Sequence, residues 1–276
     1  MRREASIRAA GVLLGALLAL GVSSLRAQDP PARAPQPTAG IQQTERPAAN
    51  LSDEQWGDLY MVRKEYDKAI ELYAHALRLQ TPSPQSEMKI AILWNKTGIC
   101  YQQKMDYNHA RESYKKAIRL DQTYAQPWNN MGSTYYLAGK AKKSIKFYRR
   151  AIKMSPEVAS FHLNLGTAYF ARKKYEQATR EYRAAIQLDP EVLTRNPESQ
   201  GTTVETRYTN AKFYFYMAKI FASVGEPDKA VRYLERAMEE GFNSQKRILQ
   251  DPDIQKISKY PAFITLMKNP PVAIKE

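Results

Sequence analysis

The chain has 276 residues, of which 43% are hydrophobic and 25% are charged, so it can bury a sizeable core and has the composition of a soluble protein rather than a membrane bundle. Lys and Arg total 42 against 28 Asp and Glu, and the net charge of +14 attracts anions without naming a partner. The single cysteine, Cys100, excludes an internal disulfide framework and a multi-cysteine zinc site.

Residues 1–27 have the order of a secretory signal peptide, with three arginines before an apolar run over 9–22 and then small residues that lead to Ala27. The run is shorter than the ~20 residues that span a bilayer. We expect cleavage after Ala27, which would leave a periplasmic or secreted protein. Because Leu25 is larger than the usual residue at that place, an uncleaved N-terminal helix that anchors the protein is the alternative.

Residues 28–50 contain five prolines and almost no large apolar residue. Such a segment cannot bury enough surface to offset the entropy lost on ordering. It is predicted to be a disordered linker between the export signal and the folded body.

The clearest internal repeat runs from Trp128 to Pro156 and reads W-N-N-M-G-S-T-Y, then eight residues, then S-I-K-F-Y-R-R-A, and ends in M-S-P. It resembles the tetratricopeptide repeat pattern, and the equivalent glycines at 98, 132 and 166 are 34 residues apart, which is the period of that family. The resemblance implies an all-α fold, a right-handed α-solenoid of about five antiparallel helical hairpins with a C-terminal helical cap.

Two longer spacings predict insertions, because Gly57 and Gly98 are 41 residues apart and Gly166 and Ala218 are 52 apart. The cap is expected to cover the apolar face of the last repeat, which has no neighbour beyond it. The expected organisation is a repeat domain over 51–268 with repeats near 51–81, 91–123, 125–158, 159–192 and 208–241, insertions at 81–88 and 191–207, capping helices over 244–268 and a tail at 269–276. The apolar residues expected to form the cap are Ile248, Leu249, Ile254, Ile257, Phe263, Leu266 and Met267.

No catalytic motif is found in the sequence. The three histidines, His75, His109 and His162, lie in different repeats without metal-ligand spacing, and packing explains each of them more simply. Cys100 is expected to be a small buried residue rather than a nucleophile. The sequence therefore predicts a non-enzymatic protein with no catalytic residue, no metal site, no cofactor and no small-molecule substrate.

A partner-binding groove is predicted on the first helices of the hairpins, because the resemblance implies that these helices line the concave side of the array and hold a protein or peptide. Its residues are expected to point away from the packing between helices. They are Asn95, Gln126, Asn129, Asn130, Ser133, Asn164, Thr167, Lys212 and Lys219.

Basic residues concentrate on the second helices and predict an exposed cationic face. A solvated surface without a dedicated role is one interpretation. The other is contact with an anionic membrane surface or an acidic partner. Nucleic acid is not expected, because export separates the protein from it. The basic face consists of Lys142, Lys143, Lys146, Arg149, Arg150 and Lys153.

Overall fold

The computed structural model describes residues 51–193 and 211–273, which belong to one compact unit. The predicted signal peptide, the linker and most of the second insertion lie outside the described residues. The described part is all α, without a strand, and none of its helices is both long and apolar enough to cross a membrane. The all-α class predicted from the repeat is confirmed.

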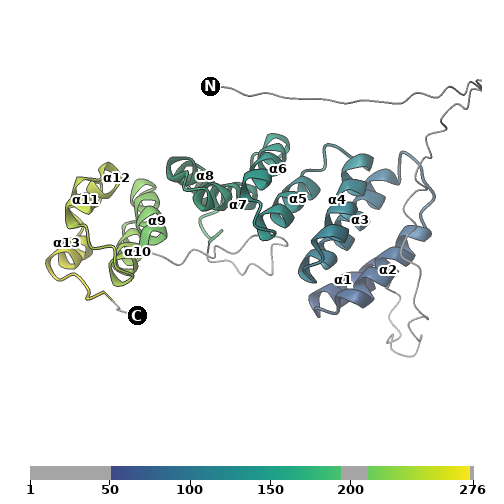
Figure 1. Cartoon of the computed structure of the whole chain (residues 1–276), viewed down its shortest axis with the longest axis horizontal. Coiled ribbons are helices and arrows are strands. Elements are labelled where there is room, and N and C mark those ends of the chain that lie inside the picture. The colour runs from purple at the N-terminus through teal and green to yellow at the C-terminus, as the bar shows by residue number, and fades with distance from the viewer. Residues whose placement is uncertain (1–50, 194–210, 274–276) are drawn as a thin grey trace, which may run out of the picture. The chain divides into compact units, whose positions relative to one another are not determined.

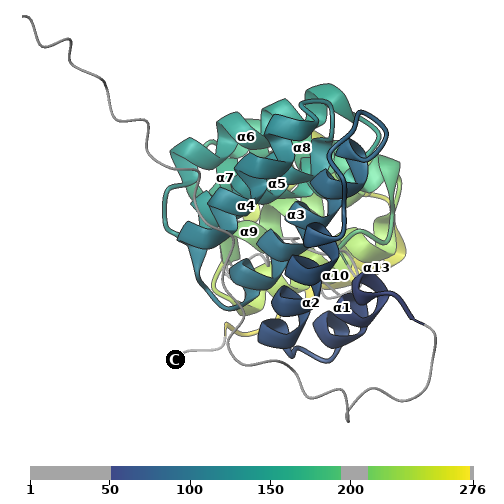
Figure 2. The ribbon, with the colours of Figure 1, turned by 90° about the vertical axis from the view of Figure 1, so that its right-hand side faces the viewer.

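Ten helices form five antiparallel hairpins that follow one another along the chain (Figures 1 and 2). The second helix of each hairpin packs against the first helix of the next. The pairs are α1 (Asp53–Val62) with α2 (Tyr66–Arg78), α3 (Glu87–Gln103) with α4 (Tyr107–Leu120), α5 (Ala125–Leu137) with α6 (Ala141–Met154), α7 (Ala159–Ala171) with α8 (Tyr175–Leu188), and α9 (Ala211–Ser223) with α10 (Pro227–Glu239).

The helix α3 begins at Glu87, inside the stretch where an insertion was expected up to residue 88. No proline follows Pro84 before the apolar pattern of Ile90 and Ala91, so the helix extends back to Ser86, whose carbonyl accepts from the N–H of Ile90. The break between the first two hairpins is therefore shorter than the spacing of their glycines suggested.

A glycine and a tyrosine close each of the first four hairpins, with the glycine on the first helix and the ring 16 residues later on the second. A Cβ atom added to any of these glycines would lie 2.5–2.7 Å from a ring carbon, so only glycine lets the ring lie against the first helix. The fifth hairpin has Ala218 and Leu234 in these two places, and both are fully buried. The four pairs are Gly57 with Tyr73, Gly98 with Tyr114, Gly132 with Tyr148, and Gly166 with Tyr182.

The first helices also contact one another directly, since α3 packs on α5 and α5 on α7. The second helices α4, α6 and α8 make no direct contact of comparable extent with each other. Layers that lie closer together are on the inside of a curved stack, so α3, α5 and α7 form its inner layer. This is the arrangement that the groove prediction assumed.

The C-terminal cap consists of α11 (Gln245–Gln250), α12 (Pro252–Gln255) and α13 (Pro261–Lys268). Gly241 ends the preceding hairpin at a φ of +93°, a conformation that suits glycine. Ile248, Ile254 and Phe263 join the core of the last hairpins, as predicted. Leu249 is the exception, because its side chain is 49% exposed.

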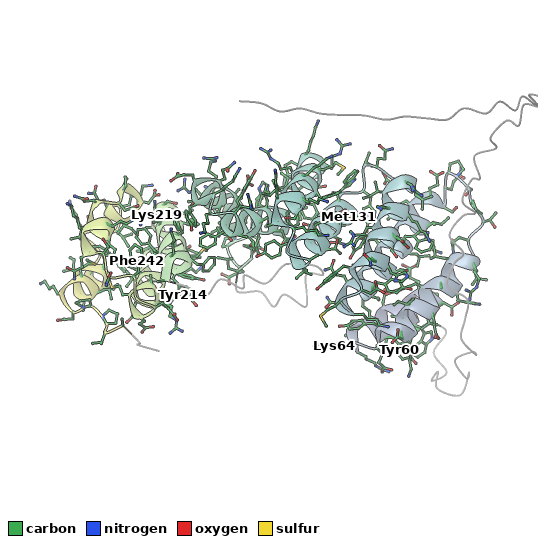
Figure 3. The ribbon with its side chains drawn as sticks, viewed as in Figure 1. Tyr60, Lys64, Met131, Tyr214, Lys219 and Phe242 are labelled. Atoms are coloured by element: carbon green, nitrogen blue, oxygen red, sulfur yellow. The ribbon has the colours of Figure 1, made fainter. Side chains whose placement is uncertain are left out.

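One residue in the turn of each hairpin has a positive φ, and in three of the five hairpins it is not glycine (Lys64 is labelled in Figure 3). Lys64, Met105 and Lys173 have φ values of 63°, 60° and 58°, whereas Gly139 and Gly225 occupy the same place in the other two hairpins. A left-handed conformation costs an L-residue about 1–2 kcal/mol. The repeat therefore carries a strained turn wherever glycine is missing.

We expect Met105→Gly to raise the free energy of unfolding by about 1 kcal/mol, because it removes this strain and its exposed side chain loses little packing. Gly139→Ala is the matched reversal, since nothing lies within 4 Å of the added Cβ and only the backbone conformation is penalised. Urea unfolding followed by circular dichroism measures both variants. A Met105→Gly protein less stable than the native chain would contradict the prediction.

Candidate functional site

A connected row of side-chain amides crosses the inner layer from α7 to α3. Asn164 on α7 donates to Oδ1 of Asn129 on α5 at 3.0 Å, and Asn129 donates to Oδ1 of Asn130 at 3.2 Å. Asn130 donates to Oδ1 of Asn95 on α3 at 2.9 Å, and Asn95 donates to the hydroxyl of Tyr124 at 3.3 Å. The row joins three successive hairpins by hydrogen bonds between their first helices.

The four asparagines are buried, with 0–5% of each residue exposed, so the expectation that they point away from the packing was wrong. An amide both donates and accepts, and can therefore continue a hydrogen-bonded row inside the protein at little cost in unsatisfied groups. Their assignment to a partner-binding groove stays a prediction.

Ser133 and Thr167 are also buried rather than turned outward, which corrects the same expectation. Each follows a glycine that contacts a tyrosine ring, and each accepts a hydrogen bond of 3.3 Å from the hydroxyl of that tyrosine, Tyr148 or Tyr182. These two residues satisfy the polar end of a buried ring.

The other predicted groove residues retain some contact with solvent. Gln126 on α5 is exposed, and Lys212 on α9 is partly exposed with its Nζ 4.1 Å from the centre of the Tyr175 ring. Lys219 on α9 (Figure 3) pairs with Asp251, at the start of the cap helix α12, over 2.8 Å. Lys219 therefore holds the cap against the last hairpin.

The structure places all six residues of the basic face on α6 and exposes all of them. Among the described residues no acidic side chain forms an ion pair with any of the six. Arg150 lies over the ring of Trp128 at 5.6 Å, and Lys143 over that of Tyr135 at 5.9 Å. The remaining four are Lys142, Lys146, Arg149 and Lys153.

Cys100 and the three histidines make contacts within the repeat domain. Cys100 is fully buried, and burial raises the pKa of its thiol to about 12, so it stays protonated at neutral pH. His75 and His109 each contact one aspartate. No group of three or more His, Cys, Asp or Glu side chains suited to a metal ion occurs among residues 51–193 and 211–273.

His162 occupies the place of Trp94 and Trp128 in the repeat and links α7 to two neighbouring elements. Its Nδ1 lies 2.8 Å from Oε2 of Glu181 on α8, and its Nε2 lies 3.0 Å from the carbonyl of Pro156. Both partners only accept hydrogen bonds, so both contacts are made only by the protonated ring. The hydrogen bond to Glu181 raises the pKa of His162, against the opposing effect of burial.

We expect the stability of the chain to fall as pH rises through the raised pKa of His162. The imidazole of His162 binds its proton more tightly in the folded protein than in the unfolded chain. Its contribution to stability is therefore complete below the unfolded pKa of about 6.5 and is lost as pH rises above the folded pKa. The measurement is the urea midpoint between about pH 5.5 and pH 9, with His162→Phe as the control. Equal pH dependence of the two proteins would rule out this role for His162.

Tyr124, which ends the amide row, was not predicted from the sequence. The hydrogen bonds among the asparagines were not predicted either. A signal existed, because Asn95 and Asn129 are 34 residues apart, as are Asn130 and Asn164. Each hydrogen bond between helices joins an asparagine at the second of these two positions to the asparagine at the first position of the preceding repeat, as Asn130 joins Asn95. The sequence shows the spacing but not that the side chains turn inward.

Comparison with known proteins identifies the repeat. One tetratricopeptide repeat family model matches residues 48–123 and a second matches residues 129–192. No curated protein matches the chain.

Several solved structures are similar over part of the chain. MamA (residues 41 to the end) from Desulfovibrio magneticus RS-1 is 16% identical, with a TM-score of 0.46 over 68% of this chain and 92% of its own. YrrB, described as a TPR protein with an unusual peptide-binding site, is 17% identical, with a TM-score of 0.44 over 70% and 86%. The first TPR of Spaghetti (RPAP3), bound to an HSP90 peptide, is 22% identical, with a TM-score of 0.37 over 41% and 86%. Similarity at this level transfers neither a partner nor a binding site.

Proposed function

We propose, because the chain belongs to the tetratricopeptide repeat family, that it is a non-enzymatic scaffold or adaptor that binds a protein or peptide. Stacked helical repeats present extended surfaces, and their usual work is protein interaction. The inner layer of α3, α5 and α7 is the proposed binding surface. These helices contact one another directly and are joined by the buried amide row, so they form one continuous layer across three hairpins.

The scaffold is proposed to act in the cell envelope or outside the cell. This rests on the signal-like order of residues 1–27 and on the proline-rich residues 28–50 that follow. The mass of the protein recovered from the envelope tests it, since cleavage removes residue 1. A retained N-terminus would favour the anchored alternative.

Capture of a partner tests the binding surface. The full chain is immobilised and exposed to detergent-solubilised envelope extract, then washed at about 0.5 M salt, where exposed charges are largely screened. A partner that survives this wash and is lost with Gln126→Ala supports the inner surface. The Gln126 side chain reaches solvent on α5, and Lys115→Ala on α4 is the control at an exposed site outside the inner layer.

A second candidate function uses the basic face of α6 instead of the inner layer. The observation in its favour is that all six cations are exposed and lack an acidic partner among the described residues. It proposes an electrostatic binder of an anionic envelope surface or an acidic partner. Complete elution of captured material by salt would favour it over the inner surface.

A further inference from the structure

The third hairpin has an unusual charge for this chain. Residues 122–156 contain seven Lys and Arg and no Asp or Glu, although the whole chain has 28 acidic residues. All seven cations lie in the stretch from Lys140 to Lys153, at the start of α6 (Figure 1) and along it. Residues 122–156 therefore carry half of the chain's net charge of +14.

Four of these cations form a line along the outer side of α6. Lys142, Lys146, Arg149 and Lys153 recur at intervals of four, three and four residues, which keeps them on one face of a helix. All four are exposed. Eleven residues of helix measure about 16 Å, so the line is long and one side chain wide.

The line opens at its N-terminal end into a hollow of about 650 Å³ between the α5–α6 turn and the end of α7. Lys140, Lys142 and Lys143 line it from one side, and Arg172 lines it from the other. No acidic residue contributes to its wall. The basic face thus has a concave end as well as a linear part.

The neighbouring second helices show that the acid-free face is narrow. Glu112 is exposed on α4, and Glu176 is exposed on α8. A bilayer would meet a broad basic surface and gain from inserted apolar side chains. No large hydrophobic side chain of α6 is exposed. A narrow line of cations without apolar side chains suits a chain of carboxylates better than a membrane.

We propose that the outer face of α6 and the adjoining hollow bind an acidic segment of a partner protein, with Asp or Glu carboxylates against Lys142, Lys146, Arg149 and Lys153 and in the hollow. The inference rests on the proposed scaffold function and names the partner chemistry of its second surface. An extended chain rises about 3.3 Å per residue, so about five residues cover the line.

The test uses a fluorescein-labelled peptide of roughly eight glutamates, long enough to cover the line and enter the hollow. Its binding to the full chain is measured by anisotropy at about 0.1 M salt, where the Debye length is about 10 Å. The test variant combines Lys142→Gln, Lys146→Gln and Arg149→Gln. The control variant combines Lys115→Gln, Arg119→Gln and Arg180→Gln on α4 and α8, which are also exposed and remove the same charge.

The test variant is expected to bind the peptide about tenfold more weakly or worse, since each exposed ion pair contributes a factor of about two to five. The control is expected to change binding no more than about twofold, because the charges that it removes lie off the line. An equal loss of peptide affinity in both variants would mean that only the net charge of the protein matters, and this would overturn the proposal. Binding of anionic lipid vesicles through α6, without binding of the peptide, would also overturn it, because the ligand would then be a membrane.

The two proposals fail separately. Capture by the inner surface is measured after a high-salt wash and depends on Gln126, whereas peptide binding is measured at about 0.1 M salt and depends on α6. A chain that retains a salt-resistant partner but ignores the acidic peptide loses only the inference about α6.

Discussion

Gly132→Ala is expected to lower the free energy of unfolding by about 1–3 kcal/mol. The added Cβ would lie 2.6 Å from a ring carbon of Tyr148, which is fully buried and donates its hydroxyl to Ser133. Helix propensity alone predicts the opposite sign, since alanine is favoured over glycine by about 1 kcal/mol within a helix. The urea midpoint of the helical circular dichroism signal decides between the two effects.

The fifth hairpin indicates how the clash can be relieved, because Ala218 and Leu234 stand there in place of glycine and tyrosine. Adding Gly132→Ala to Tyr148→Leu should therefore raise stability, whereas the same change in the native chain lowers it. Residues in contact show coupling energies of about 0.5–3 kcal/mol in such a cycle.

Gly241→Ala is the control for this cycle, since nothing lies within 4 Å of its added Cβ. Its effect should be the same with or without Tyr148→Leu. Additive effects of Gly132→Ala and Tyr148→Leu would mean that the ring moves aside, and that the glycine is not required by packing.

The hairpins could be predicted because their signal is repeated at a fixed spacing. The positions of Gly98, Gly132 and Gly166 mark where two helices approach, and the tyrosines opposite them follow from the same register. The strained turns could not be predicted, since the repeat places a left-handed residue there whether or not the sequence supplies glycine. Met105 looks ordinary in the sequence and is strained only in the structure.

The candidate site was predicted less completely than the fold. Asn130 and Asn164 were identified on the correct helices, but a polar side chain on a first helix was taken to face solvent. Whether such a side chain points inward depends on the residue that faces it on the neighbouring hairpin, and the sequence of a single repeat does not show that residue. The ion pair of Lys219 with Asp251 could not be predicted either, because Asp251 lies in the cap, outside the repeat.

Asn130→Ala is expected to cost about 2 kcal/mol or more. Asn130 accepts from Asn129 and donates to Asn95, and its loss leaves two buried amide groups without these hydrogen bonds, each worth about 1–3 kcal/mol when left unsatisfied. Gln126→Ala on the same helix is the control, since an exposed residue of this kind changes stability by no more than about 0.5 kcal/mol. Equal urea midpoints for the two variants would contradict the prediction.

Gly132→Ala and Asn130→Ala should also change the unfolding transition in different ways. Gly132→Ala strains the packing within one hairpin, whereas Asn130→Ala weakens the contact between α3 and α5, which belong to different hairpins. In a repeat array the second effect lowers the interaction between neighbours, and cooperative unfolding depends on that interaction. Asn130→Ala should therefore broaden the urea transition as well as shift it, while Gly132→Ala mainly shifts it. Because the asparagines hold the inner layer together, loss of a partner in an asparagine variant indicates a binding contact only when the unfolding transition keeps its width.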